Sequence, residues 1–197
     1  MYKNLAAALA AVCFFLLTPM PAAVAQTPLP LKVGFVYVTP LTGAGWVHQH
    51  DLGRQAMLAA LNPPGAPVRV TSTVVENVAE GPDAERVIRD LARQGHQLIV
   101  TPSFGYMEPT LNVAQEFPGV RFESITGYKT APNVATANAR YYEGRYLAGV
   151  AAGRMSKSHV AGYVAGFPIP EVLQGINAFA LGMQSVDATA QVKVVWL

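Results

Sequence analysis

The sequence predicts an α/β protein built on a doubly wound parallel sheet. Short segments rich in valine and aromatic residues, such as residues 32–39 (KVGFVYVT), have the composition of buried strands. Segments with apolar residues at helical spacing separate them, and strands that alternate with helices favour a parallel sheet covered on both faces. The chain has 197 residues, 51% of them hydrophobic, which is enough for one sizeable core or for one small lobe and part of another.

The expected elements alternate along the chain. Strands are predicted over residues 32–39, 68–75, 98–100, 120–125, 134–137, 159–165 and 192–196, and helices over residues 46–61, 82–94, 109–117, 141–155 and 170–183. The helix at 82–94 is the clearest, because Pro82 suits its first turn and Gly95 suits its C-terminal cap. Glu85 and Arg89 are spaced for an ion pair on its exposed face.

The last part of the sequence carries two further signals. Gly149 and Gly153 lie four residues apart in one predicted helix, a spacing that permits close approach of another backbone. The chain ends on a strand-like segment, QVKVVWL, that is typical of the interior of a domain. We therefore expect a fragment whose remaining strands are absent.

The first twenty-five residues predict export. Lys3 precedes an apolar run, Leu5 to Leu17, which Thr18-Pro19-Met20-Pro21 interrupts, and Ala23-Val24-Ala25 is a small-residue cleavage site. A membrane-spanning helix needs roughly 20 apolar residues, and this run is shorter; an uncleaved anchor is the alternative. We expect cleavage after Ala25 and a periplasmic location, which disfavours most ATP- and NAD-dependent enzymes.

Composition excludes several kinds of chemistry. The single cysteine, Cys13, lies in the export signal, where lipid attachment is a second alternative, so the exported chain has neither a disulfide nor a reactive thiol. The formal net charge is +2 with no block of basic residues, so we expect no nucleic-acid partner.

The loops that follow the predicted strands carry aromatic rings. In open parallel sheets, ligands bind beyond the C-terminal ends of the strands. The relevant loops are residues 40–46, 103–106, 127–129 and 166–169, each with a glycine and nearly all with a ring. Rings outside the helical stripes suit a flat heteroaromatic ligand, since stacking on a base is worth ~1–3 kcal/mol. The alternative is that the rings only fill the loop layer.

Motifs for catalysis and for cofactors are incomplete. Gly43-Ala44-Gly45 starts a dinucleotide fingerprint, but His48 stands where the third small residue belongs. His48 and His50 do not share a helix face, and Ser103 lacks a nucleophile elbow. We therefore expect no cofactor, no metal and no catalytic residues.

Three segments are more specific: VGFVYVTPLTGAGW, TPSFGYMEPTLNVAQEFPGVRFE, and the long run that begins GYKTAPNVATANARYYEGRYLAGVAAGRM. With these segments the chain resembles the basic membrane protein (BMP) family of ABC-transporter substrate-binding proteins, which includes purine-nucleoside receptors. The resemblance runs from Lys32 to Leu197. It implies a type I periplasmic-binding-protein fold, in which two α/β lobes hold a ligand in the cleft between them.

The resemblance also implies domain boundaries. After the signal peptide that the residues themselves predict at 1–25, residues 26–155 are expected to form the first α/β lobe, and residues 156–197 the start of a second lobe that is truncated. Such proteins are usually near twice the length of the exported chain. Half of the cleft is therefore expected to be missing.

The resemblance and the loops together give a candidate ligand site. Rings would wall the cleft, and polar side chains would bond to ring nitrogens or amino groups. The candidates are Trp46, Phe104, Tyr106 and Phe167 for the walls, and Ser103, Glu108 and Tyr128 for the polar contacts. Ala44 and Val47 stand near the acidic and amide positions of the family, a departure that favours a free purine base such as adenine over a nucleoside. Tyr141, Tyr142 and Arg145 are expected to fix the hinge.

We expect a monomeric solute-binding protein rather than an enzyme. It would bind a purine base or nucleoside and deliver it to an ABC permease in the inner membrane, a step that the resemblance alone implies. Two alternatives are a ligand-sensing module for a membrane receptor and an extracytoplasmic enzyme acting on nucleosides.

Overall fold

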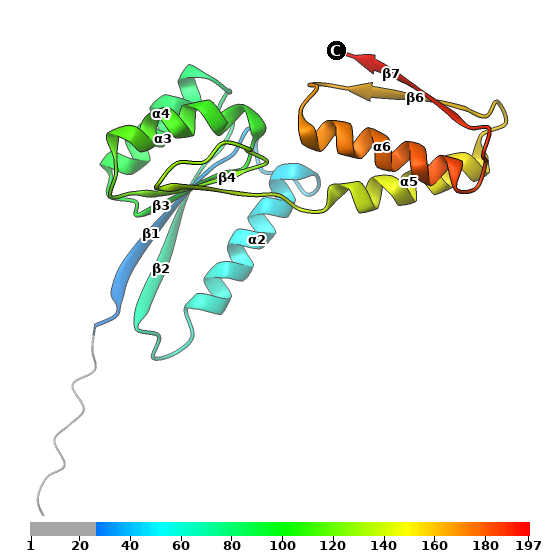
Figure 1. Ribbon diagram of the computed structural model, residues 1–197. Coiled ribbons are helices and arrows are strands. Elements are labelled where there is room, and N and C mark those ends of the chain that lie inside the picture. Colours follow the sequence, from blue (N-terminus) through cyan, green and yellow to red (C-terminus); the bar gives the residue numbers. More distant parts are fainter. Residues whose placement is uncertain (1–26) are drawn as a thin grey trace, which may run out of the picture.

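The computed structural model describes residues 27–197. The expected signal peptide, its cleavage site after Ala25, and Cys13 lie outside these residues. The described chain forms two α/β lobes, and it passes once from the first to the second through an extended segment (Figure 1). None of the described helices combines the length and the apolar character required to cross a membrane.

The first lobe is a parallel five-stranded sheet in the order β2-β1-β3-β4-β5. Its strands are β1 (Leu29–Val36), β2 (Val68–Val75), β3 (Leu98–Thr101), β4 (Arg121–Ile125) and β5 (Val134–Ala137). Its helices are α2 (Trp46–Leu61), α3 (Pro82–Arg93), the 3₁₀ helix η1 (Phe104–Tyr106) and α4 (Met107–Glu116). The predicted alternation of strands and helices is thereby confirmed.

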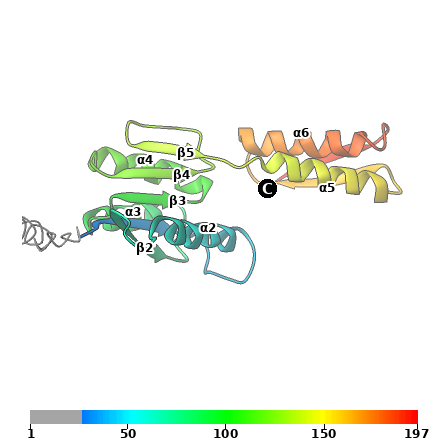
Figure 2. The same ribbon diagram turned by 90° about the horizontal axis from the view of Figure 1, so that it is seen from below.

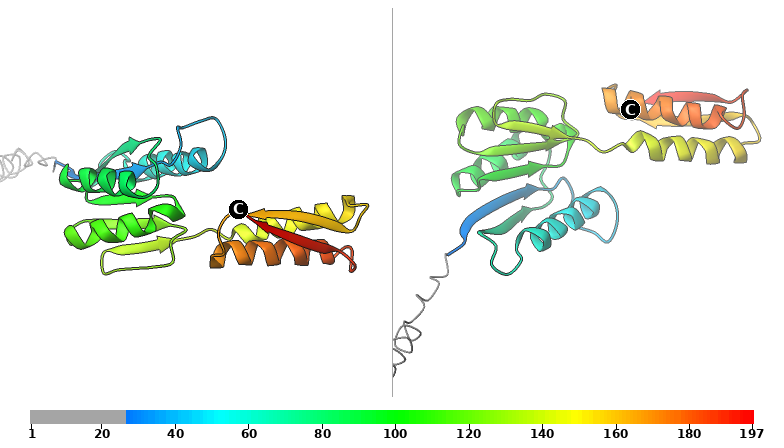
Figure 3. Two further views of the ribbon diagram at one scale, coloured as in Figure 1. Left: turned by 90° about the horizontal axis from the view of Figure 1, so that it is seen from above. Right: turned by 60° about the horizontal axis from the view of Figure 1, so that its bottom comes forward.

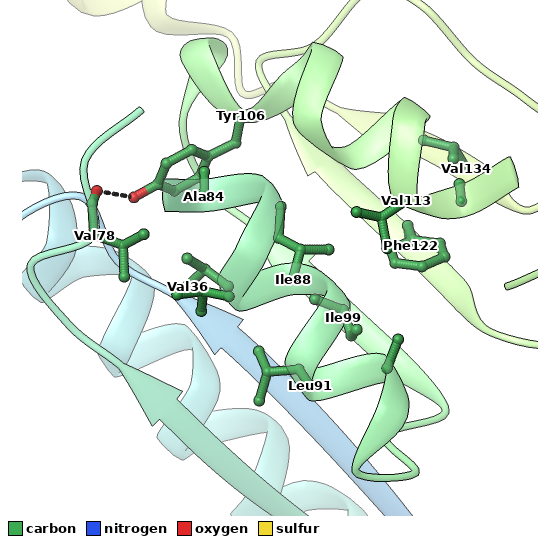
Figure 4. Packing of buried hydrophobic residues seen from close by; sticks show 13 residues of the cluster. Val36, Val78, Ala84, Ile88, Leu91, Ile99, Tyr106, Val113, Phe122 and Val134 are labelled. Atoms are coloured by element: carbon green, nitrogen blue, oxygen red, sulfur yellow. Dashed lines mark hydrogen bonds between the residues drawn. The ribbon is translucent and has the colours of Figure 1, made fainter. Parts of the chain in front are cut away.

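The larger core of this lobe lies between the sheet and helices α3 and α4 (Figures 1 and 4). Ala84, Ile88 and Leu91 come from the apolar stripe of α3, and Ile99 and Phe122 come from the sheet. These side chains are 2% exposed or less. This stripe has the spacing that the sequence predicted for the helix.

Residues of β1 alternate between the two faces of the sheet, as the twofold period of a strand requires. Val36 belongs to the core under α3 and α4, whereas Val33 and Phe35 belong to a second cluster on the α2 side. Val47 of α2 packs in this second cluster. The strand is therefore buried on both faces, which explains its nearly continuous apolar sequence.

A buried polar network joins α2 to the sheet. Asp51 is 2% exposed, and its Oδ1 accepts hydrogen bonds from Arg54 Nε at 2.6 Å and from the Tyr37 hydroxyl at 3.2 Å. Gln55 Nε2 donates to Asp51 Oδ2 at 2.6 Å, and Arg54 Nη1 donates to Ser72 Oγ at 2.9 Å. The bond from Arg54 holds the pKa of Asp51 below its ordinary value. The network fixes the helix that begins at the candidate site.

The second lobe contains α5 (Tyr141–Met155), β6 (Val160–Ala165), α6 (Pro170–Gln184) and β7 (Gln191–Trp196), with β6 and β7 paired in parallel. Helices α5 and α6 run side by side, with the two strands beside them (Figures 2 and 3). A Cβ at Gly149 would collide with the carbonyl of Phe179, and one at Gly182 would collide with the carbonyl of Tyr146. The close backbone approach predicted from the glycines of α5 is present. By its packing, α5 belongs with the second lobe, whereas the sequence prediction assigns it to the first.

Two elements start more than one residue before the predicted position. Strand β1 starts at Leu29, because β2 pairs with it from Leu29 onward, while β3 pairs only with residues 33–35 and so leaves Pro30 without a required donor on that side. The helix expected from Pro109 begins at Met107, because proline is tolerated in the first turn of a helix, where its missing N–H has no partner.

Candidate functional site

A cavity of about 320 Å³ lies where the two lobes meet, beyond the carboxyl ends of β1, β3 and β6. The first lobe supplies lining residues that include Trp46, Ser103 and Phe104, and the second lobe supplies Gly166, Phe167 and Glu171. A volume of this order is typical of small-molecule sites. Four of the seven residues expected at a ligand site thus share one cavity.

The ring of Trp46 is fixed by polar and aromatic contacts. Its Nε1 donates to the carbonyl of Pro102 at 2.7 Å, and its ring centroid lies 4.5 Å from that of His50 and 5.7 Å from that of Tyr141. The residue nevertheless keeps 38% of its surface exposed. A ring held in place at its edge presents a preformed face to a ligand.

Phe104 lies between two other rings. Its centroid is 6.1 Å from that of Tyr128, with the planes 25° apart, and 6.1 Å from that of Phe167, with the planes 35° apart. A third ring between Phe104 and Phe167 needs two layers of carbon contacts at about 3.5–4 Å each, or about 7–8 Å in total. A base can therefore enter between them only if the lobes separate slightly.

Three expected residues do not line this cavity. Tyr106 is fully buried in the core of the first lobe, where its hydroxyl donates to the carbonyl of Val78 at 2.6 Å (Figure 4). The sequence prediction placed this ring in the cleft; the 3₁₀ turn at 104–106 directs it inward instead. Glu108 pairs with Lys129 at the exposed rim, and Tyr128 covers Phe104 from outside. Of the four predicted wall residues, three remain.

Glu80 lines the cavity and was missed by the sequence analysis. Glu80 lies in the loop that follows β2. Ligands bind beyond strand ends, so the loop after β2 was a place to look for site residues, as were the loops after the other strands. Ser103 Oγ donates to Glu80 Oε1 at 2.5 Å. The predicted polar residue Ser103 therefore holds a carboxylate in place at the wall of the cavity.

A second carboxylate comes from the other lobe. Glu171 lies in the first turn of α6 and lines the same cavity. Burial raises the pKa of the Tyr141 hydroxyl, and the negative charge of Glu171 raises it further. Among the described residues that line the cavity, none is lysine or arginine. The cavity thus combines aromatic walls with negative charge.

A larger hollow, of about 690 Å³, lies in the second lobe along β6, α5 and α6. Tyr141, Arg145 and Tyr163 line it, and β7 contributes none of its lining residues. It therefore follows the edge of β6 that β7 does not cover. The smaller cavity is the better candidate site, because it alone joins strand ends from both lobes.

The described residues contain no group of three or more His, Cys, Asp or Glu side chains placed to hold a metal ion. His48 and His50 both lie on α2. Burial lowers the pKa of His50, which packs against Trp46. The site chemistry visible in the described chain is that of rings, hydroxyl groups and carboxylates.

Residues 31–197 match the family described as ABC transporter substrate-binding protein, PnrA-like. A purine-binding protein of Brucella abortus is 54% identical over 167 residues, which cover 85% of this chain and 46% of that protein. A putative ABC transporter glucose-binding protein of Haloferax volcanii is 38% identical over 167 residues, covering 85% of this chain and 41% of that protein. The chain thus spans less than half the length of the curated relatives it matches.

Solved structures show the same fold. An ABC transporter solute-binding protein of Aeropyrum pernix matches with a TM-score of 0.63 at 23% identity, over 85% of this chain and 47% of the other. One from Conexibacter woesei matches with a TM-score of 0.61 at 23% identity, over 84% and 54%. These similarities confirm the predicted periplasmic-binding-protein fold class.

Proposed function

Because the chain belongs to the family of PnrA-like ABC transporter substrate-binding proteins, we propose that it binds a purine base in the cavity between its two lobes. Trp46 and Phe104 wall the ligand from the first lobe, and Phe167 closes on it from the second. The observation that carries this proposal is the gathering of these three rings, from two lobes, around one cavity. The name of the relative from Brucella abortus supports a purine as the ligand.

The physical basis is stacking in a cavity that closes. A flat ring on an aromatic face gains ~1–3 kcal/mol in nucleic-acid systems. Separation and return of Phe104 and Phe167 would admit the base and then exclude water, as in other two-lobed binding proteins. Ser103 and the nearby carboxylates supply the polar contacts that fix its orientation.

Calorimetric titration with adenine, guanine and adenosine tests the proposal. We expect one site per chain, and adenine as the tightest ligand. Binding must leave the ligand chemically unchanged, which chromatography of the recovered ligand checks. Release of a free base from adenosine would instead indicate a nucleoside-cleaving enzyme.

A sugar is the second candidate ligand, because the relative from Haloferax volcanii is named as a putative glucose-binding protein. Carboxylates at the wall of an aromatic cavity can also accept hydrogen bonds from sugar hydroxyls. Titration with glucose under the same conditions separates the two. A heat of binding with glucose, and none with any purine, would identify a sugar rather than a purine as the ligand.

We propose further that the protein is exported and delivers its ligand to an ABC permease in the inner membrane. Family membership and the signal-like sequence before Gln26 support this. N-terminal sequencing of the protein recovered from the periplasm should begin at Gln26. A start at Met1 would mean that the signal is retained.

A further inference from the structure

The cavity has an electrostatic character that neither the family nor the relatives' names assign. Its lining includes a carboxylate from each lobe, Glu80 and Glu171, and no lysine or arginine among the described lining residues. Neither carboxylate forms an ion pair with a described cationic side chain. Their charges are therefore available to a ligand.

We propose that Glu80 determines which ligand the cavity accepts: a planar ring that presents N–H donors and carries no negative charge. This inference rests on the proposed function and names the chemistry of that same site. Glu80 accepts hydrogen bonds from the ring, while the two carboxylates together repel a phosphorylated ligand. A purine base or nucleoside is then bound, and a nucleotide is rejected.

The position of the Glu80 carboxylate is set by two neighbours. Ser103 Oγ donates to its Oε1, and no described residue donates to its Oε2. The carboxylate lies directly against Gly105, where a Cβ would collide with all three of its terminal atoms. Glycine at position 105 therefore leaves the space that the carboxylate occupies.

A ligand cannot approach the Glu80 carboxylate from the core of the first lobe. Tyr106 follows Gly105 in the chain. Burial raises the pKa of the Tyr106 hydroxyl, and the negative charge of Glu80 raises it further. That hydroxyl donates to the carbonyl of Val78 rather than to Glu80. Glu80 thus lines the cavity and takes no part in the hydrogen bond that Tyr106 makes in the core.

The recognition chemistry follows from the donor and acceptor inventory. An ionised carboxylate only accepts hydrogen bonds, so its partner on a ligand must be an N–H or O–H group. Bonds to a charged acceptor are about twice as strong as neutral ones. A phosphate group near two unpaired carboxylates meets like-charge repulsion, which is a common means of rejecting a wrong ligand.

Calorimetry with adenine and AMP tests the inference on the purified protein and on Glu80→Gln. We expect adenine to bind the variant about 10- to 100-fold more weakly, as for the loss of a hydrogen bond to a charged group. AMP should bind the unsubstituted protein at least about tenfold more weakly than adenine, and Glu80→Gln should narrow that ratio, because one repelling charge is gone.

Two further variants make the result specific. Glu108→Gln removes a carboxylate that lies outside the cavity and pairs with Lys129, so it should leave adenine affinity unchanged. Gly105→Ala displaces the end of the flexible Glu80 side chain, so it should weaken adenine binding while circular dichroism and the melting temperature stay close to those of the parent protein.

The outcomes separate this inference from the proposed function. Tight adenine binding by Glu80→Gln, or AMP binding as tight as adenine binding, would overturn the role of Glu80 while leaving a purine-binding protein. Absence of purine binding by the unsubstituted protein would overturn both.

Discussion

The rings of Phe104 and Phe167 face each other across the two lobes, with centroids 6.1 Å apart and planes tilted by 35°. Phe104 lies in η1 of the first lobe, and Phe167 follows β6 of the second. Phe167 is 62% exposed, so little else holds it in this position. The contact therefore links ligand entry to the distance between the lobes.

Trp46→Ala should weaken adenine binding roughly 5- to 150-fold, the range for loss of one stacking contact. The adenine affinity of Trp46→Phe should fall between those of Trp46→Ala and the parent protein, because phenylalanine keeps a ring but loses the hydrogen bond to the carbonyl of Pro102. Calorimetry measures both affinities.

The matched control is Trp196→Phe, which changes the other of the two tryptophans in the chain. Trp196 ends β7, is 43% exposed and does not line the cavity. The affinity of Trp196→Phe for adenine should equal that of the parent protein. Equal affinities for all three variants would mean that Trp46 only packs against its neighbours.

Gly149→Ala should destabilise the second lobe, because the new Cβ would collide with the carbonyl of Phe179 in α6. Overpacking of this kind costs about 1–3 kcal/mol in the free energy of unfolding. The control is Gly144→Ala in the same helix, where nothing lies within 4 Å of the added Cβ. That change should stabilise by about 0.5–1 kcal/mol, since alanine favours a helix. Urea unfolding measures the stability of both variants. Equal destabilisation by Gly149→Ala and Gly144→Ala would contradict the close contact of α5 and α6.

Asp51→Asn should lower the free energy of unfolding by about 3 kcal/mol at pH 7, because it leaves Arg54 without its buried partner. The pKa of Asp51 is lowered in the folded state, so its stabilisation is present above the unfolded pKa of ~3.9 and is lost as pH falls through the folded value. The difference between the two proteins should therefore hold from pH 7 to 5 and shrink below pH 4.

Asp83→Asn is the control for this effect. The Asp83 side chain is 62% exposed, and its pair with Arg86 at 3.6 Å lies on the surface. Such pairs contribute little, so the free energy of unfolding should change by less than about 0.5 kcal/mol at every pH tested. Urea unfolding at pH 7, 5 and 3 gives both comparisons. A constant effect of Asp51→Asn down to pH 3 would count against the ionised network.

Periodicity and turn residues predicted the fold well because each acts locally. The apolar stripe of α3, with Pro82 at its start, specifies that helix without reference to the rest of the chain. The side of the lobe boundary to which α5 belongs could not be read in this way. It depends on Gly149 meeting Phe179 in α6, a tertiary contact between two helices that the local pattern of either helix does not specify.

The site was predicted in part, for a similar reason. Trp46, Ser103 and Phe104 follow β1 and β3, which are neighbours in the sheet of the first lobe, so the topology of that sheet brings them together. Phe167 follows β6 in the separate sheet of the second lobe, and it lines the same cavity because the lobes meet there. The direction of Tyr106 depends on a single 3₁₀ turn, and a ring in a loop can point to the core as readily as to a ligand. Glu80 was missed because the loop after β2 contains no aromatic ring to draw attention to it.

A crystal structure of the protein with adenine tests the central claim most directly. We expect density for a planar ring in the cavity between the lobes, in contact with the faces of Trp46 and Phe104, with Phe167 covering it and Phe104 and Phe167 moved to about 7–8 Å apart. Density in the hollow beside Tyr163, or at a surface remote from both lobes, would contradict the account.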